Sequence, residues 1–168
     1  MLTGLTRHAD LAPLHAYAQQ RYGGPSTYTW TDETGASHCI RQAEGGEQGN
    51  PLMPALYSLA QHPALAALQP QLEDGEAVFA YLDDVYILAH PHRIRPLYNA
   101  LAEALWHHAH VQLNAAKTRV WNMAGEKPPH IQDLQPQDGN PIWVGNWALP
   151  PVQQGLQVLG APIGTEQR

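Results

Sequence analysis

The chain has 168 residues, of which 43% are hydrophobic and 14% are charged, enough for one globular domain with a core. Its formal net charge of −6 excludes general electrostatic attraction to a nucleic acid backbone, which would need a local basic patch. The single cysteine, Cys39, excludes an intrachain disulfide and predicts an intracellular protein. No apolar run approaches the ~20 residues of a membrane span, so no membrane partner is expected.

The first 70 residues predict two helices separated by a hairpin and a loop. Apolar residues at helical spacing predict each helix, and β-prone runs around an Asp32–Gly35 turn predict the hairpin. In chain order the predicted elements are a helix over 7–21, strands over 26–30 and 37–40, a glycine-rich loop over 44–51, and a helix over 53–68.

The rest of the chain predicts mainly strands around one amphipathic helix. Its predicted elements are a hairpin over 77–80 and 85–89, a helix over 94–108, a short strand over 119–122, and a last hairpin over 157–164. Trp30, Trp106 and Trp121 lie in apolar patterns and are predicted to be core residues. Together these elements predict an α+β fold with helices on one face of a small antiparallel sheet.

The most informative stretch is Tyr81-Leu82-Asp83-Asp84, between two β-prone runs. Aspartate is a poor strand former, and two adjacent carboxylates repel each other, so a hairpin with both acids at its tip suggests a need for their charge. A divalent metal ion would supply that need, because Mg²⁺ prefers oxygen ligands and relieves the repulsion. The alternative is that Asp83 and Asp84 simply form the turn.

Four segments in this order resemble the conserved regions of reverse transcriptases, especially those of non-LTR retrotransposons. Gln48–Pro54 is similar to the glycine-proline loop of region B, and Tyr81–Asp84 matches the aromatic-x-Asp-Asp box of region C. Asn114–Thr118 is similar to region D, and Val158–Gly160 to the primer grip. The resemblance covers residues 22–164, nearly the whole chain.

The resemblance implies a partial reverse transcriptase palm with a ferredoxin-like core. Residues 1–124 would form the palm with regions B to D, and residues 125–168 a connection ending in a primer-grip-like hairpin. The implied activity is RNA-directed DNA synthesis, a metal-dependent nucleotidyl transfer. Its partners would be an RNA template, a DNA primer and deoxynucleoside triphosphates.

The resemblance also implies roles for individual residues. Asp83 and Asp84 would be catalytic and would bind Mg²⁺ or Mn²⁺, and Lys117 would act on the leaving pyrophosphate. The residues implied to contact the nucleotide or the template are Gln48, Gly49, Asn50, Pro51 and Tyr81. Leu159 and Gly160 would align the primer end.

Two departures from the family pattern change the expectation for activity. The first catalytic aspartate of the family has no match here, because no apolar strand leads into Asp10. The resemblance therefore predicts a missing upstream polymerase segment and an isolated chain that is inactive. At Asn50 the family usually has aspartate, and this change could weaken a contact made in the loop.

Other functional interpretations stay open. The chain could instead be a non-catalytic retroelement remnant that is inert or binds RNA weakly. An unrelated metal-dependent hydrolase would need more acids or histidines around Asp83. Histidines at 90, 92, 107, 108 and 110 could hold a transition metal, although no cysteine lies nearby.

Overall fold

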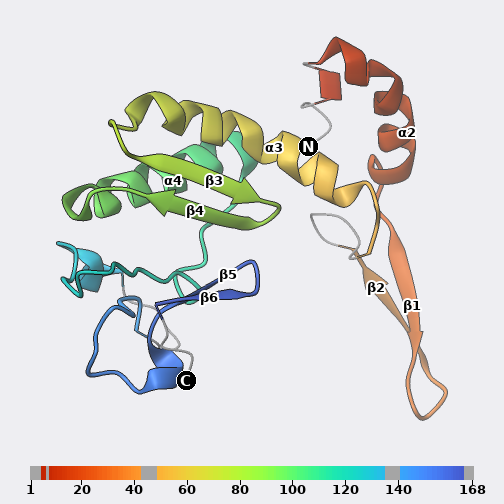
Figure 1. Ribbon diagram of the computed structural model, residues 1–168. Coiled ribbons are helices and arrows are strands. Elements are labelled where there is room, and N and C mark those ends of the chain that lie inside the picture. The colour runs from red at the N-terminus through yellow and green to blue at the C-terminus, as the bar shows by residue number, and fades with distance from the viewer. Residues whose placement is uncertain (1–4, 7, 43–48, 135–140, 165–168) are drawn as a thin grey trace. The chain divides into compact units, whose positions relative to one another are not determined.

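The protein has a mixed α+β fold, shown as a computed structural model in Figure 1. The structure describes residues 5–6, 8–42, 49–134 and 141–164. These residues form three α-helices and six strands: α2 (Ala12–Tyr22), β1 (Thr27–Thr31), β2 (Ser37–Arg41), α3 (Met53–Leu68), β3 (Ala77–Tyr81), β4 (Asp84–Leu88), α4 (Ile94–Ala109), β5 (Leu156–Val158) and β6 (Ala161–Ile163). The chain divides into two compact units, Met1–His62 and Pro63–Arg168, and the division lies inside α3.

The core of the first unit lies between α2 and the first half of α3. Leu5, Ala18 and Leu56 are buried, and partly buried side chains pack around them: Leu11, Tyr22, Leu52, Met53 and Leu59. Pro13 lies in the first turn of α2, where a missing N–H removes no helical hydrogen bond. Gly23 ends the helix by donating its N–H to the carbonyl of Gln19 at 2.8 Å.

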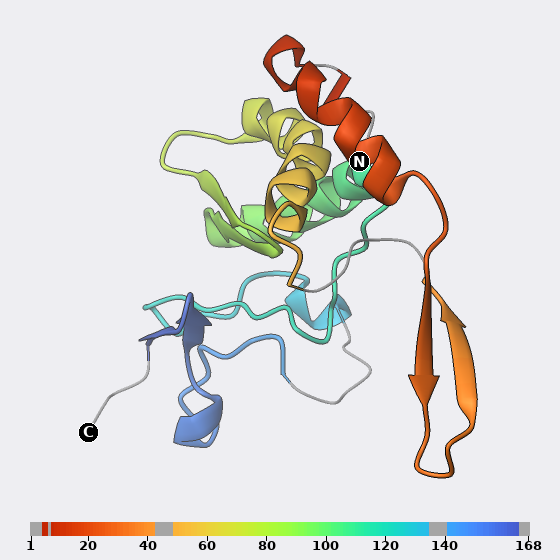
Figure 2. The same ribbon diagram turned by 90° about the vertical axis from the view of Figure 1, so that its right-hand side faces the viewer.

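Strands β1 and β2 form an antiparallel ribbon (Figure 2). All residues of both strands are exposed. Asp32 closes its turn, because Asp32 Oδ1 accepts hydrogen bonds from the N–H groups of Thr34 and Ala36. The imidazole of His38, 2.7 Å from Asp32 Oδ2, and the hydroxyl of Thr34 lower the pKa of Asp32 to about 2. The turn is thus held by local hydrogen bonds rather than by a core.

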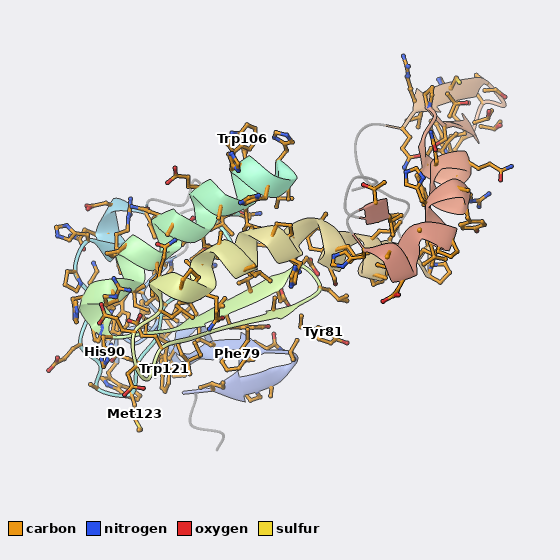
Figure 3. The ribbon with its side chains drawn as sticks, turned by 90° about the horizontal axis from the view of Figure 1, so that it is seen from above. Phe79, Tyr81, His90, Trp106, Trp121 and Met123 are labelled. Atoms are coloured by element: carbon orange, nitrogen blue, oxygen red, sulfur yellow. The ribbon has the colours of Figure 1, made fainter. Side chains whose placement is uncertain are left out.

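The second unit buries the second half of α3 and one face of α4 against the β3–β4 ribbon. Ala64, Leu68, Leu97, Leu101 and Leu105 are buried together, and three strand residues pack against them: Val78, Val85 and Ile87. The leucines of α4 recur every four residues, which places them on one side of a helix. Both helices therefore cover the same face of this ribbon (Figures 1 and 3).

The predicted helices and hairpins are confirmed, except that the first α-helix begins at Ala12, after a 3-10 turn over Ala9–Leu11, and not at residue 7. The second helix has the predicted bounds, Met53–Leu68, and the third ends at Ala109. The prediction that Trp30 and Trp106 are core residues is wrong, because the two residues are 54% and 53% exposed. Among the described helices, none is both long and apolar enough to cross a membrane.

The described strands do not form the one small sheet that the sequence predicts. They pair as three separate two-stranded ribbons, β1–β2, β3–β4 and β5–β6. The strand predicted over 119–122 is wrong: Val120 makes one isolated parallel bridge with Trp143. Pro141 and Gly145 flank that partner segment, and both residue types limit the length of a strand.

Candidate functional site

The candidate site is the tip of the β3–β4 hairpin. Tyr81, the last residue of β3, pairs with Asp84, the first residue of β4, and Leu82 and Asp83 form the two-residue turn. The sequence prediction of a hairpin with both acids at its tip is therefore confirmed. Leu82 has φ 55°, a conformation that costs an ordinary side chain about 1–2 kcal/mol, so the turn is strained where the acids lie.

Both carboxylates at the tip are exposed to solvent. The hydroxyl of Tyr86 donates a hydrogen bond of 3.3 Å to Asp84 Oδ2. Tyr86 lies two residues after Asp84 on the same strand, so the two side chains share one face. Among the described residues, no group of three or more His, Cys, Asp or Glu side chains could hold a metal ion. The described tip therefore offers two carboxylates as ligands.

An aromatic surface extends from the acids along the face of the ribbon that points away from the helices. Phe79 pairs with Tyr86 across the ribbon, and Tyr81 pairs with Asp84, so these side chains share that face. Phe79 and Tyr81 are 56% and 59% exposed. Both side chains are labelled in Figure 3. Exposed rings beside carboxylates can stack on nucleotide bases.

The base of the hairpin is held by a charged cluster around Arg93. Arg93 Nη2 donates to the carbonyl of Gln71 at 2.6 Å and lies 3.3 Å from Glu76 Oε2, and Arg93 Nε lies 3.2 Å from Glu73 Oε1. The N–H of Glu73 donates to Glu76 Oε2 at 2.9 Å. These bonds tie the segment before β3 to the residue before α4.

The cluster predicts a pH-dependent stability. The N–H of Glu73 and the guanidinium of Arg93 lower the pKa of Glu76 from its ordinary value of 4.5. Because the folded-state pKa is lowered, Glu76 stabilises the fold above pH 4.5, and the contribution is lost as the pH falls through the lowered pKa. We expect Glu76→Gln to lower the urea midpoint near pH 7 but to have less effect at an acid pH below the lowered pKa, where the carboxyl is protonated.

The matched control is Glu103→Gln, which changes an exposed glutamate on α4. It should shift the midpoint little at either pH, because surface substitutions usually change stability by less than about 0.5 kcal/mol. An equal shift for Glu76→Gln at both pH values would contradict the assigned role of its charge.

Lys117 lies in a tight turn of its own. Asn114 Oδ1 accepts hydrogen bonds from the N–H groups of Ala116 and Lys117 at 3.0 and 3.3 Å. Arg119 Nη1 donates to the carbonyls of Ala116 and Thr118 at 2.6 and 2.8 Å. The turn thus presents an exposed Lys117 on a fixed backbone. Among the described residues, no hydrogen bond or ion pair joins Lys117 to Asp83 or Asp84.

The predicted primer grip forms the turn of the β5–β6 hairpin. Leu159 and Gly160 are both exposed, with φ values of 49° and 85°. Positive φ at both positions is the conformation that favours a tight two-residue hairpin. The prediction of a turn at these residues is confirmed, and their contact with a primer stays a prediction.

The glycine-proline loop lies in the first unit. Gln48 falls outside the described residues; Gly49 and Pro51 are exposed, and Gly49 has φ 87°. Asn50 is half-buried, and its Oδ1 accepts hydrogen bonds from the Tyr22 hydroxyl at 2.8 Å and the Leu52 N–H at 3.0 Å. These two bonds need only an oxygen acceptor, which aspartate would also supply. An asparagine oxygen is therefore sufficient for both bonds at this position.

The structure brings Tyr81, Asp83 and Asp84 together at one tip, while Lys117 and the Leu159–Gly160 turn belong to other segments of the second unit. Two tyrosines that were not predicted to belong to the site, Tyr86 and Tyr22, also contact predicted site residues. Tyr86 could have been found from the two-residue period of a strand. Tyr22 gave no local signal, because it lies 28 residues from Asn50.

No protein-family model, curated protein or solved structure matches this chain. The resemblance to reverse transcriptases therefore stays a prediction based on four short motifs.

Proposed function

We propose that the chain is a palm segment of an RNA-directed DNA polymerase and that the β3–β4 tip is its metal-binding site. The observation that carries the proposal is the pair of exposed carboxylates, Asp83 and Asp84, at a strained turn next to an exposed Tyr81. Turn formation alone does not require two acids or a leucine at positive φ.

The donor set fits a magnesium ion. Mg²⁺ usually keeps several waters and binds through one or two carboxylates together with substrate phosphates. Asp83 and Asp84 would hold such an ion, which would neutralise phosphate charge during nucleotidyl transfer. A two-metal reaction needs a further carboxylate, which the described residues do not bring to this tip.

The side chains around the acids would orient the substrates. The exposed ring of Tyr81 can stack against a base, and the Tyr86 hydroxyl holds Asp84 through a hydrogen bond. Lys117, presented on its turn, would neutralise or protonate a pyrophosphate leaving group. This division of roles assigns binding to the hairpin and charge neutralisation to the lysine turn.

The test is primer extension by the full chain on an RNA template with Mg²⁺ or Mn²⁺. Templated extension that stops when the ions are chelated would support the proposal. A folded chain that neither binds Mn²⁺ nor extends a primer would contradict it.

The second candidate is a non-catalytic remnant that binds RNA. The exposed aromatic face of the β3–β4 ribbon favours it, because base stacking needs neither a metal nor a third carboxylate. RNA binding without extension, and unaffected by chelation, would favour this function over the first.

A further inference from the structure

Asn50 joins two parts of the first unit that are distant in sequence. Its Oδ1 accepts the hydroxyl of Tyr22, the last residue of α2, and the N–H of Leu52. Its carbonyl accepts the N–H of Met53, the first residue of α3, at 3.1 Å. One residue thus connects the end of α2 to the start of α3.

Packing fixes both ends of this connection. Tyr22, Leu52 and Met53 are partly buried against the cluster of Leu5, Ala18 and Leu56. The packing of the Tyr22 ring therefore fixes the position of its hydroxyl. The Asn50 amide is held between this hydroxyl and the start of α3. Gly49 and Pro51, on either side, remain exposed.

We propose that Tyr22 is a positioning residue which, through Asn50, fixes the Gly49–Leu52 loop for binding a primer–template duplex. The part of this inference that concerns nucleic acid rests on the proposed function. Tyr22 itself touches no substrate; it acts by satisfying the Asn50 oxygen and so restricting the backbone of the loop. A bond between partly buried groups is suited to this role, because solvent competes less for it than at the surface.

The experiment compares Tyr22→Phe, Asn50→Ala, the double variant and Asn50→Asp. The control is Tyr17→Phe, which removes the hydroxyl of an exposed tyrosine on the same helix. The first readout is amide hydrogen exchange at Leu52. The second is the affinity of the full chain for a fluorescent RNA–DNA primer–template duplex, which requires no catalysis.

We expect Tyr22→Phe to speed exchange at Leu52 by roughly 3- to 10-fold, as for the loss of one hydrogen bond, and to weaken duplex binding. Asn50→Ala should have a larger effect, the double variant no more than Asn50→Ala, and Asn50→Asp should keep wild-type exchange because it retains the oxygen.

Two results would overturn the inference. Exchange at Leu52 that is equal in Tyr22→Phe and Tyr17→Phe would show that the bond does not hold the loop. Faster exchange with unchanged duplex affinity would show that the loop position does not matter for binding. A wild-type chain that binds no duplex would contradict the proposed function, while the exchange comparison would still decide whether Tyr22 anchors the loop.

Discussion

Replacing Asp83 by asparagine is expected to weaken Mn²⁺ binding by at least ~10-fold and to abolish any metal-dependent primer extension. Asparagine keeps the size and the turn preference of aspartate but removes the charge that would hold a divalent ion at the proposed site. Loss of a metal ligand removes several kcal/mol of transition-state stabilisation, at about tenfold in rate for each 1.4 kcal/mol. The enhancement of water proton relaxation by bound Mn²⁺ measures the affinity directly.

The control is Asp74→Asn, which neutralises another exposed aspartate of the second unit, in the turn before β3. It should leave Mn²⁺ affinity unchanged, and both variants should keep the wild-type circular dichroism spectrum. Asp84→Asn should also weaken binding, and it removes the charged acceptor of the Tyr86 hydroxyl. Equal Mn²⁺ affinity in the wild type and Asp83→Asn would show that the acids only form the turn.

The elements that sequence predicts well here are those with strong local patterns. The helix over Met53–Leu68 and the two hairpins with two-residue turns have the predicted positions. In α4, Leu97, Leu101 and Leu105 follow helical spacing and are buried, whereas His108, one residue before the helix ends, is exposed. Helix ends lose their packing neighbours, so periodicity predicts burial less well there.

The features that sequence did not predict depend on contacts between distant segments. Trp30 lies in a β-prone apolar run, yet no core covers the β1–β2 ribbon among the described residues. Whether Val120 pairs at one position or over a whole strand depends on its partner segment around Trp143, which begins two residues after Pro141. A strand pattern predicts the local conformation but not the length of its pairing.

In the candidate site, too, local features were predicted and contacts between distant segments were not. The acidic tip was predicted because two β-prone runs and two aspartates lie within thirteen consecutive residues. The hydrogen bond from Tyr22 to Asn50 spans 28 residues and could not be predicted, because no local sequence pattern connects two residues so far apart.

Leu101→Ala is expected to have the largest effect on stability, about 2–5 kcal/mol of the free energy of unfolding. Leu101 is 3% exposed and lies in the buried cluster with Leu97 and Leu105, against which Val78 and Ile87 pack. Its removal would leave a cavity directly behind the ribbon that carries Asp83 and Asp84. Urea unfolding of the full chain, followed by circular dichroism, measures the change.

Leu88→Ala is the matched control, because it truncates the same residue type on the other face of the ribbon, where Leu88 is 55% exposed. We expect that variant to lose less than about 1 kcal/mol, since little apolar area leaves water at this position on folding. If the two variants were equally stable, α4 could not be packed on β3 and β4 as described. The acidic tip joins those two strands. A clearly larger loss of stability in Leu101→Ala than in Leu88→Ala would therefore also show that the strands carrying the candidate metal site pack against α4.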